Sequence, residues 1–197
     1  MEEGSLNTDL TSAVILAGGR GSRLGGREKG EISISGERLI DLVVRGAREA
    51  GCREIVIAGD VSSRGAVTVR EEPPFGGPVA GLAAALDQAT GEWILLLGCD
   101  LPRAGELCGL IVDEAGSLSS RADGIVVVDR GRHQWLSGLC RRSSLESSLA
   151  SLGESSGASL QALLGSLDLV EIADPGGLSR DIDTPDDLAA AQRKDAP

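Results

Sequence analysis

Short apolar runs alternate with amphipathic stretches along most of the chain. Residues 13–17 form a continuous apolar run that stops at Gly18, which predicts a buried strand followed by a turn. Residues 38–50 instead place their apolar side chains at the i, i+3, i+4 and i+7 positions of one helix face, and Gly51 follows as a stop signal. The two patterns predict a strand and then a helix.

The same alternation continues to the end of the chain. We expect further strands at residues 54–58, 66–69, 93–98, 124–128, 134–140 and 168–172. We expect further helices at residues 78–88, 105–118, 143–152 and 159–167, and a last helix with Thr184 as N-cap and Pro185 at its first position. Buried strands that alternate with helices predict a three-layer α/β domain with a mostly parallel, doubly wound, Rossmann-like sheet.

The length of 197 residues fits one such domain, which we place at residues 12–197. Residues 1–11 are polar and acidic and have none of the features of a signal peptide, so we expect a disordered lead-in there. With one Phe, two Trp and no Tyr, the core has to consist of Val, Ile, Leu and Ala.

The net charge of −11 argues against general binding to nucleic acid or to an anionic membrane. The strongest apolar run, at residues 93–97, is far shorter than the ~18 residues of a membrane span, and we expect a cytoplasmic protein. Four cysteines occur without a Cys-x-x-Cys pair and with only one histidine, which argues against a zinc site. They are expected to be small buried hydrophobic residues in a reducing compartment: Cys52, Cys99, Cys108 and Cys140.

A glycine- and arginine-rich loop follows the first strand, from Leu16 to about Gly30. Glycines at the carboxyl end of a strand let backbone N–H groups approach phosphate oxygens, although such a loop can also be purely structural. The loop fails the dinucleotide-binding fingerprint at Leu24, and Lys29 lacks the neighbours of a Walker A lysine. Its four basic residues indicate a site for a small anionic ligand: Arg20, Arg23, Arg27 and Lys29.

Three acidic residues are candidates for a metal site. Asp100 follows the apolar strand 93–98 directly, where its carboxylate could face the ligand crevice and offer Mg²⁺ the hard oxygen that it prefers, or could simply cap the turn before Pro102. Asp181 and Asp183 stand two residues apart and share a face if the segment is extended. Solvated acids in front of a capped helix are the alternative for this pair.

Five motifs, taken together and in order, resemble the GT-A-like nucleotidyltransferases, and among them the molybdenum cofactor guanylyltransferases. Residues 16–25 and 29–30, Leu-Ala-Gly-Gly-x-Gly-x-Arg-Leu-Gly and Lys-Gly, are similar to the signature loop of the superfamily. Gly-Pro-Val-Ala-Gly at 77–81, Cys-Asp-Leu-Pro at 99–102 and Asp-Ile-Asp-Thr-Pro-Asp-Asp-Leu at 181–188 resemble the later motifs of the guanylyltransferases.

The resemblance implies an activity: Mg²⁺-dependent transfer of GMP from GTP to the phosphate of molybdopterin or its molybdenum-loaded form, with release of pyrophosphate. It implies that the first loop borders the nucleotide, through Leu16, Ala17, Gly18, Gly19, Arg20 and Gly21. Arg23 and Lys29 would hold the triphosphate, and Glu71 or Glu72, of which we choose Glu72, would lie near the base or ribose. Asp100 would bind Mg²⁺, with Asp183 as a second ligand, so that the expected catalytic residues are Lys29, Arg23 and Asp100.

Other activities share the same motifs. Cytidylyl transfer, or nucleotidyl transfer to another small phosphorylated acceptor, would use the same loop, lysine and aspartate. A nucleotide-binding module without catalysis is a further alternative, which the presence of Lys29 and Asp100 disfavours. His133 stands where acceptor contacts could be made, although a hydrogen-bonded turn histidine explains it as well. The partners expected are GTP and a phosphorylated pterin, with the protein a monomer or weak homo-oligomer.

Overall fold

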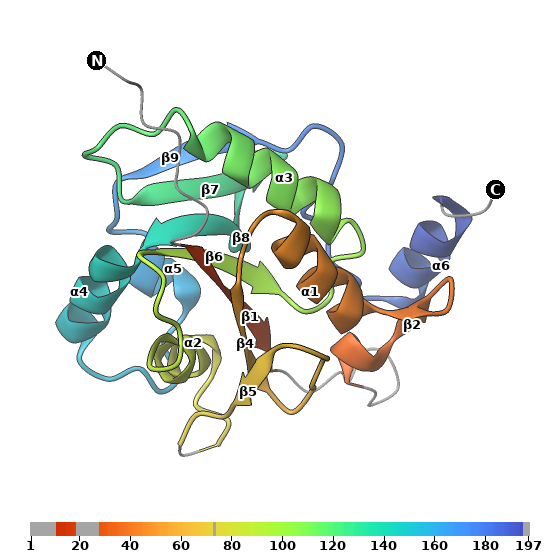
Figure 1. Ribbon diagram of the computed structural model, residues 1–197, viewed down its shortest axis with the longest axis horizontal. Helices are drawn as coiled ribbons and strands as arrows, with labels where there is room; N and C mark the ends of the chain where they lie inside the picture. Colours follow the sequence, from red (N-terminus) through yellow and green to blue (C-terminus); the bar gives the residue numbers. More distant parts are fainter. Residues whose placement is uncertain (1–10, 19–27, 73, 195–197) are drawn as a thin grey trace.

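The computed structural model describes residues 11–18, 28–72 and 74–194, and its centre is a seven-stranded sheet (Figure 1). The strands follow the order β5-β4-β1-β6-β8-β7-β9 across the sheet. Their bounds are β1 (Thr11–Ala17), β4 (Glu54–Gly59), β5 (Val67–Val69), β6 (Trp93–Gly98), β7 (Gly124–Asp129), β8 (Arg132–Arg141) and β9 (Leu169–Ala173). A separate small hairpin consists of β2 (Ser33–Ile34) and β3 (Glu37–Arg38).

The sheet is mostly parallel, as the alternating pattern predicts. Strand β1 pairs in parallel with β4 on one side and with β6 on the other, so the strand order reverses direction at β1. Such a switch point opens a crevice at the carboxyl ends of the strands, where ligands bind in open α/β sheets. Only β8, among the described strands of this sheet, runs the opposite way, antiparallel to both β6 and β7.

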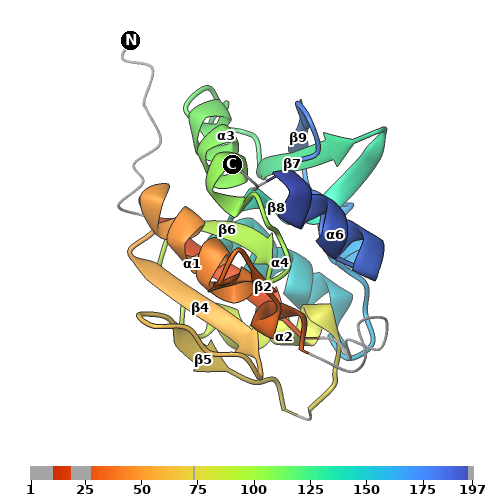
Figure 2. The ribbon, with the colours of Figure 1, turned by 90° about the vertical axis from the view of Figure 1, so that its right-hand side faces the viewer.

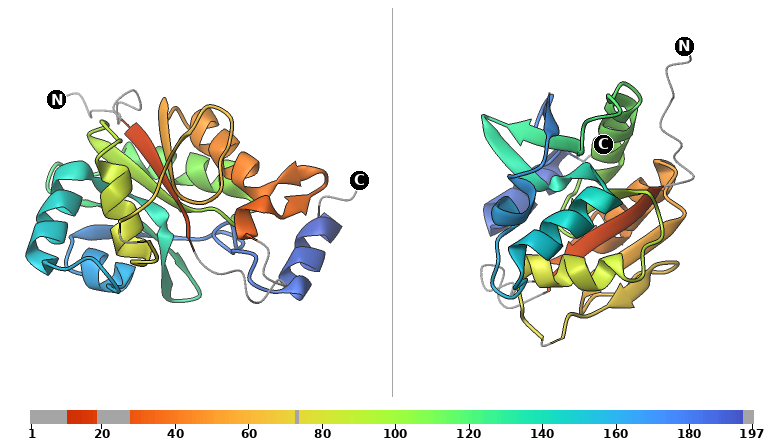
Figure 3. Two further views of the ribbon diagram at one scale, coloured as in Figure 1. Left: turned by 90° about the horizontal axis from the view of Figure 1, so that it is seen from below. Right: turned by 90° about the vertical axis from the view of Figure 1, so that its left-hand side faces the viewer.

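Helices cover both faces of the sheet. Their bounds are η3 (Lys29–Glu31), α1 (Leu39–Glu49), α2 (Pro78–Leu86), α3 (Ala104–Ala115), α4 (Arg142–Leu152), α5 (Leu160–Leu164) and α6 (Pro185–Lys194). Helices α1 and α3 pack on one face, against side chains such as Ile15, and α2, α4 and α5 pack on the other, against Val14 and Leu16. The right-hand view of Figure 3 looks onto α2 and α4 in front of the sheet.

Both cores are mostly aliphatic, as the composition predicts, with Trp93 in the first of them. Alternate residues of each buried strand point to opposite layers and so contribute to both cores. All four cysteines are free and buried in these cores, in agreement with their expected role, and burial raises the pKa of each thiol to about 12. None of the helices in the described part of the chain has the length and apolar character that crossing a bilayer would need.

The C-terminal helix α6 is set apart from the two main layers, beside β2 (Figures 1 and 2). It shares a small third core with the β2–β3 hairpin, formed by Ile32, Ile34, Leu39 and Ile182, with Leu188 of α6 packed against it. At its start the Asp187 N–H donates to Thr184 Oγ1 (3.2 Å), while the Thr184 N–H donates to Asp187 Oδ2 (2.8 Å), so Thr184 caps α6 as predicted.

Most predicted elements are present with small changes at their ends. β1 begins at Thr11, and the rest of the predicted lead-in, residues 1–10, lies outside the described residues. Helix α5 ends at Leu164, before the predicted end at 167, since Gly165 follows it. The periodicity missed η3 and the β2–β3 hairpin, because elements of two or three residues are too short to show a period.

Candidate active site

The carboxyl ends of the three central strands lie level with one another. Leu16 of β1 pairs with Ala58 of β4 on one side and with Gly98 of β6 on the other, and Ala17 pairs with Gly59. Gly59 has a positive φ of 146°, and a Cβ there would lie only 2.6 Å from the Ala17 carbonyl oxygen. Glycine at 59 therefore lets the chain turn away from β1 closely enough to leave an open edge.

A cavity of about 470 Å³ lies at this edge, a size typical of small-ligand sites. Its lining comes from the ends of β1 and β4, from the segment before α2 and from β8: Leu16, Ala17, Gly18, Glu28, Ala58, Gly59, Asp60, Arg70, Glu71, Pro74, Phe75, Gly77, Pro78, Gly81 and Leu136. The predicted nucleotide-contacting residues Leu16, Ala17 and Gly18 thus share one cavity. Of the two acids considered before α2, only Glu71 lines this cavity, and both Glu71 and Glu72 line a second hollow that borders α2 and α4.

Next to the cavity, at the end of β6, three carboxylates converge. Asp100, Asp181 and Asp183 each place an oxygen so that all three oxygens lie within 4.8 Å of one another. A backbone hydrogen bond from the Ile182 N–H to the Asp100 carbonyl (3.1 Å) holds the two segments side by side. Ile182 itself is 1% exposed in the third core, so the two acids beside it are carried by a fixed backbone.

Lys29 lies between two of these acids. Its Nζ donates to Asp100 Oδ2 (2.7 Å) and to Asp183 Oδ1 (2.5 Å). Burial by itself would lower the pKa of Lys29, but the two hydrogen-bonded carboxylates outweigh burial and leave the pKa above its ordinary value. Lys29 is therefore a fixed positive charge, and the structure brings together the predicted residues Lys29, Asp100 and Asp183 over 154 residues of sequence.

The chemistry of the three acids fits a divalent cation. Among the described residues they are the one group of three or more His, Cys, Asp or Glu side chains close enough to hold a metal ion. Partial burial of the carboxylate, and then the negative charges of Asp100 and Asp183, raise the pKa of Asp181. A small hard cation such as Mg²⁺ stabilises carboxylates that repel one another in this way, because its charge offsets the repulsion.

Two glycines make room for this arrangement. A Cβ at Gly98 would lie 2.9 Å from Asp100 Oδ1, so a larger residue there would displace the carboxylate. A Cβ at Gly30 would lie 3.2 Å from Val61 Cγ1 and 3.3 Å from the Cβ of Ile40, so glycine lets η3 sit close to α1. Gly98 thus leaves room for the carboxylate of Asp100, and Gly30 leaves room for Val61 and Ile40.

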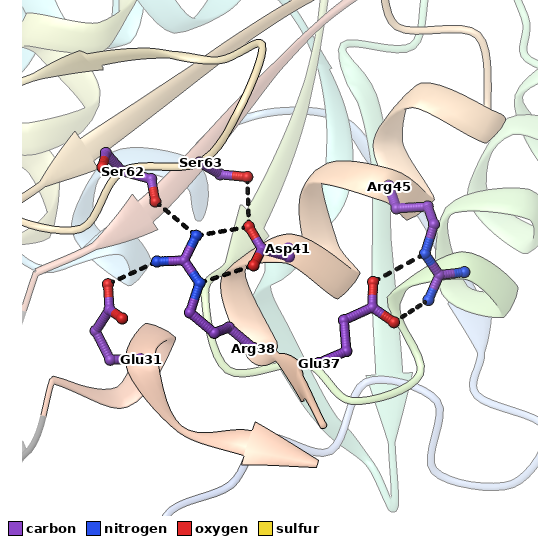
Figure 4. Close-up of polar contacts among 7 residues, drawn as sticks. All are labelled: Glu31, Glu37, Arg38, Asp41, Arg45, Ser62 and Ser63. Atoms are coloured by element: carbon purple, nitrogen blue, oxygen red, sulfur yellow. Dashed lines mark hydrogen bonds and ion pairs between the residues drawn. The ribbon is translucent and has the colours of Figure 1, made fainter. Parts of the chain in front are cut away.

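An ion-pair network anchors the segment that follows Lys29 (Figure 4). Arg38 donates to Glu31 Oε1 (2.9 Å), to both carboxylate oxygens of Asp41 (2.7 and 2.8 Å) and to the Ser62 carbonyl (3.1 Å). The Ser63 hydroxyl donates to Asp41 Oδ1 (2.7 Å). Arg38 therefore ties η3 and the segment after β4 to the start of α1, a role that the sequence analysis missed.

The remaining predicted residues are four in the first loop and His133. Gly19, Arg20, Gly21 and Arg23 lie outside the described residues. His133 lies on β8, where its Nε2 is 2.7 Å from Glu171 Oε1 and its ring is 4.8 Å from that of Trp135. The hydrogen-bonded alternative of the sequence analysis is therefore confirmed for His133, but the residue lies in a strand and not in a turn.

The sequence also matches known proteins. A family model described as MobA-like NTP transferase domain matches residues 13–170. The molybdenum cofactor guanylyltransferase of Pseudomonas putida (strain GB-1) is 35% identical over 128 residues, which cover 62% of this chain and 65% of that protein. The guanylyltransferase of the same name from Vibrio vulnificus (strain YJ016) is 33% identical, over 66% of this chain and 67% of its own. The matches span about half to two thirds of the length of such curated relatives.

Solved structures agree on the fold. Rv0371c from Mycobacterium tuberculosis H37Rv superposes with a TM-score of 0.69 at 20% identity, covering 93% of this chain and 97% of that one. The 2-C-methyl-D-erythritol 4-phosphate cytidylyltransferase from Thermus thermophilus gives a TM-score of 0.66 at 16% identity, with the same coverage. At these identities the likeness concerns the arrangement of strands and helices.

Proposed function

Because the chain belongs to the MobA-like NTP transferase domain family, we propose that it transfers GMP from GTP to the phosphate of molybdopterin, or of its molybdenum-loaded form, and releases pyrophosphate. Relatives at 35% and 33% identity carry the name molybdenum cofactor guanylyltransferase. The observation that carries the proposal is the cluster of Lys29, Asp100 and Asp183 beside a cavity of about 470 Å³ at the ends of β1 and β4.

In this proposal the cavity holds the nucleoside and the carboxylate cluster lies at the phosphates. An oxygen of the acceptor phosphate attacks the α-phosphorus, the bond from that phosphorus to the α–β bridging oxygen breaks, and pyrophosphate leaves with the electron pair. The chain needs no nucleophile of its own, since its residues act by positioning the two phosphates and by compensating their charge.

Each residue has a separate part in that chemistry. Asp100, Asp181 and Asp183 would hold Mg²⁺, which when bound supplies positive charge against the repulsion between the phosphates. Lys29, which Asp100 and Asp183 hold beside the proposed metal site, would donate to the phosphate oxygens. Arg23 is proposed to pair with the triphosphate. Leu16, Ala17 and Gly18 would border the nucleoside.

Thermal melting with Mg²⁺ and each of GTP, CTP, ATP and UTP tests the proposal. A ligand at 100 times its Kd stabilises a protein by about 2.7 kcal/mol, which raises the Tm of a domain of this size by roughly 5–10 °C. We expect the largest Mg²⁺-dependent shift with GTP, followed by pyrophosphate release when molybdopterin is added. A shift with CTP alone would replace the guanylyl donor by a cytidylyl donor, and no shift with any nucleotide would contradict the proposal.

A further inference from the structure

Phe75 is the single phenylalanine of the chain, and it lines the cavity instead of the core. The residue is 77% exposed, more than any other large apolar residue in the described part of the protein. Exposed apolar residues scattered singly over a surface need no explanation, but this one lies at the rim of the candidate nucleotide cavity. Its position there is the first reason to ask what the ring contacts when the cavity is filled.

The backbone at Phe75 is in an unfavourable conformation. Its φ is 67°, in the left-handed region that bulky side chains rarely adopt. Two contacts hold this conformation: the Phe75 N–H donates to Glu71 Oε1 (3.1 Å), and the Gly76 carbonyl accepts from the N–H of Gly157 (2.7 Å). The loop is therefore held from both sides, and the ring projects at the rim although neither the backbone conformation nor exposure to water favours it.

Much of the wall of the same cavity is apolar and includes Leu16, Ala58 and Gly81. A Cβ built at Gly81 would lie 3.5 Å from the Cβ of Ala58 and 3.8 Å from Leu16 Cδ2, so glycine, which has no side chain, leaves space beside these two apolar residues. Leu16 and Ala58 are 7% and 3% exposed. A planar heteroaromatic ring bound in the cavity would meet small apolar side chains and, at the rim, the face or edge of one aromatic ring.

We infer that Phe75 is a substrate-binding residue that stacks on the nucleobase of the bound nucleoside triphosphate. The inference rests on the proposed function, because it takes the cavity to hold the nucleoside. Every base has a π-face, so the ring contributes affinity for a base without reading which base it is. The loss of Phe75 should therefore weaken binding of all four nucleotides and leave binding of a ligand without a base unchanged.

Calorimetric titration of the whole protein with Mg²⁺-GTP, Mg²⁺-ATP and Mg²⁺-tripolyphosphate tests the inference. For Phe75→Ala we expect the Kd for both nucleotides to rise about tenfold, as is usual when a stacked aromatic is removed, with tripolyphosphate binding and the Tm unchanged. Val67→Ala is the matched control, since Val67 is also an exposed large apolar residue (53%) but does not line the cavity. It should leave all three Kd values unchanged.

A second variant reports the contact directly. Phe75→Trp places an indole at the rim, and its fluorescence should be quenched by GTP and not by tripolyphosphate, measured against wild type because Trp93 and Trp135 also emit. Nucleotide binding that Phe75→Ala leaves intact, or that falls together with tripolyphosphate binding, would overturn the inference and spare the proposed function. A wild-type protein that binds no nucleotide would overturn both.

Discussion

The two ends of the central strands use polar residues in opposite ways. At the amino ends of β1 and β4, the Ser12 hydroxyl donates to Glu54 Oε2 (2.8 Å) and accepts from the Gly91 N–H (2.8 Å). Thr90 donates its N–H to Glu54 Oε2 (2.7 Å) and its hydroxyl to Oε1 (2.8 Å). Here a single carboxylate, that of Glu54, accepts hydrogen bonds from several donors.

At the carboxyl ends, in contrast, carboxylates outnumber the basic group that lies between them. Three carboxylates, Asp100, Asp181 and Asp183, crowd around one ammonium group, that of Lys29. Like charges held this close raise the free energy of the folded protein, and a perturbed pKa such as that of Asp181 is typical of functional sites. The polar contacts at the amino ends therefore stabilise the fold, whereas the crowded charges at the carboxyl ends are typical of a ligand site. Substitutions at the two ends should separate these roles.

The largest expected effect is that of Asp100→Asn. Asparagine keeps the size of the side chain but removes the charge that Lys29 contacts and that is proposed to hold Mg²⁺, so kcat should fall by about 1000-fold while the protein still folds. Pyrophosphate release with saturating GTP and acceptor measures kcat, and circular dichroism melting checks the fold. Full activity of the purified variant would remove Asp100 from the metal site.

The next effect is that of Lys29→Ala on nucleotide binding. Charged hydrogen bonds contribute about 1.5–3 kcal/mol, so the Kd for Mg²⁺-GTP should rise about 10- to 100-fold. The Kd for GMP should change much less, because GMP lacks the β- and γ-phosphates that Lys29 is proposed to contact. Calorimetry with both ligands makes the comparison, and an equal loss for GTP and GMP would place Lys29 away from those phosphates.

The smallest effect is on stability, at the opposite end of the strands. Glu54→Gln replaces a carboxylate oxygen by an NH₂ group that cannot accept from Ser12 and Thr90, so the free energy of unfolding should fall by about 1–2 kcal/mol with kcat unchanged. Urea titration of wild type and variant measures the difference. A Glu54→Gln variant that loses activity but not stability would reverse the contrast between the two ends.

The stability that Glu54 contributes should decrease as the pH falls. The Thr90 N–H, and then the Ser12 hydroxyl, lower the pKa of Glu54 in the folded protein, which favours the carboxylate. Between the folded and unfolded pKa values the unfolded chain binds more protons, so the stabilisation is complete above the unfolded pKa and is lost as the pH falls through the folded one. The difference in the free energy of unfolding between wild type and Glu54→Gln should therefore be largest at neutral pH and should disappear in acid. A difference in the free energy of unfolding that does not change with pH would mean that Glu54→Gln acts through packing and not through the lost charge.

Several parts of the fold could be predicted because their signals are local. The apolar run of β6 was predicted with the observed bounds, Trp93–Gly98, since a five-residue aliphatic segment bounded by turn residues has few alternatives to a buried strand. The cap at Thr184 was predicted for a similar reason, because the capping contacts span only three residues. The reversed direction of β8 was not predictable, as hydrophobicity along a strand does not encode which neighbour it pairs with.

In the candidate site, too, the local features could be predicted and the long-range contacts could not. The residue types of the site can be read from the sequence alone: a glycine-rich strand end, a lysine after it, and acids after β6 and before α6. The contacts of Lys29 with both Asp100 and Asp183, and the place of Glu71 rather than Glu72 in the lining of the cavity, follow only from the folded chain. The reason is physical: side-chain chemistry and local backbone preference belong to each residue and its neighbours, whereas these contacts depend on strand order and on the third core that brings η3 and Ile182 together.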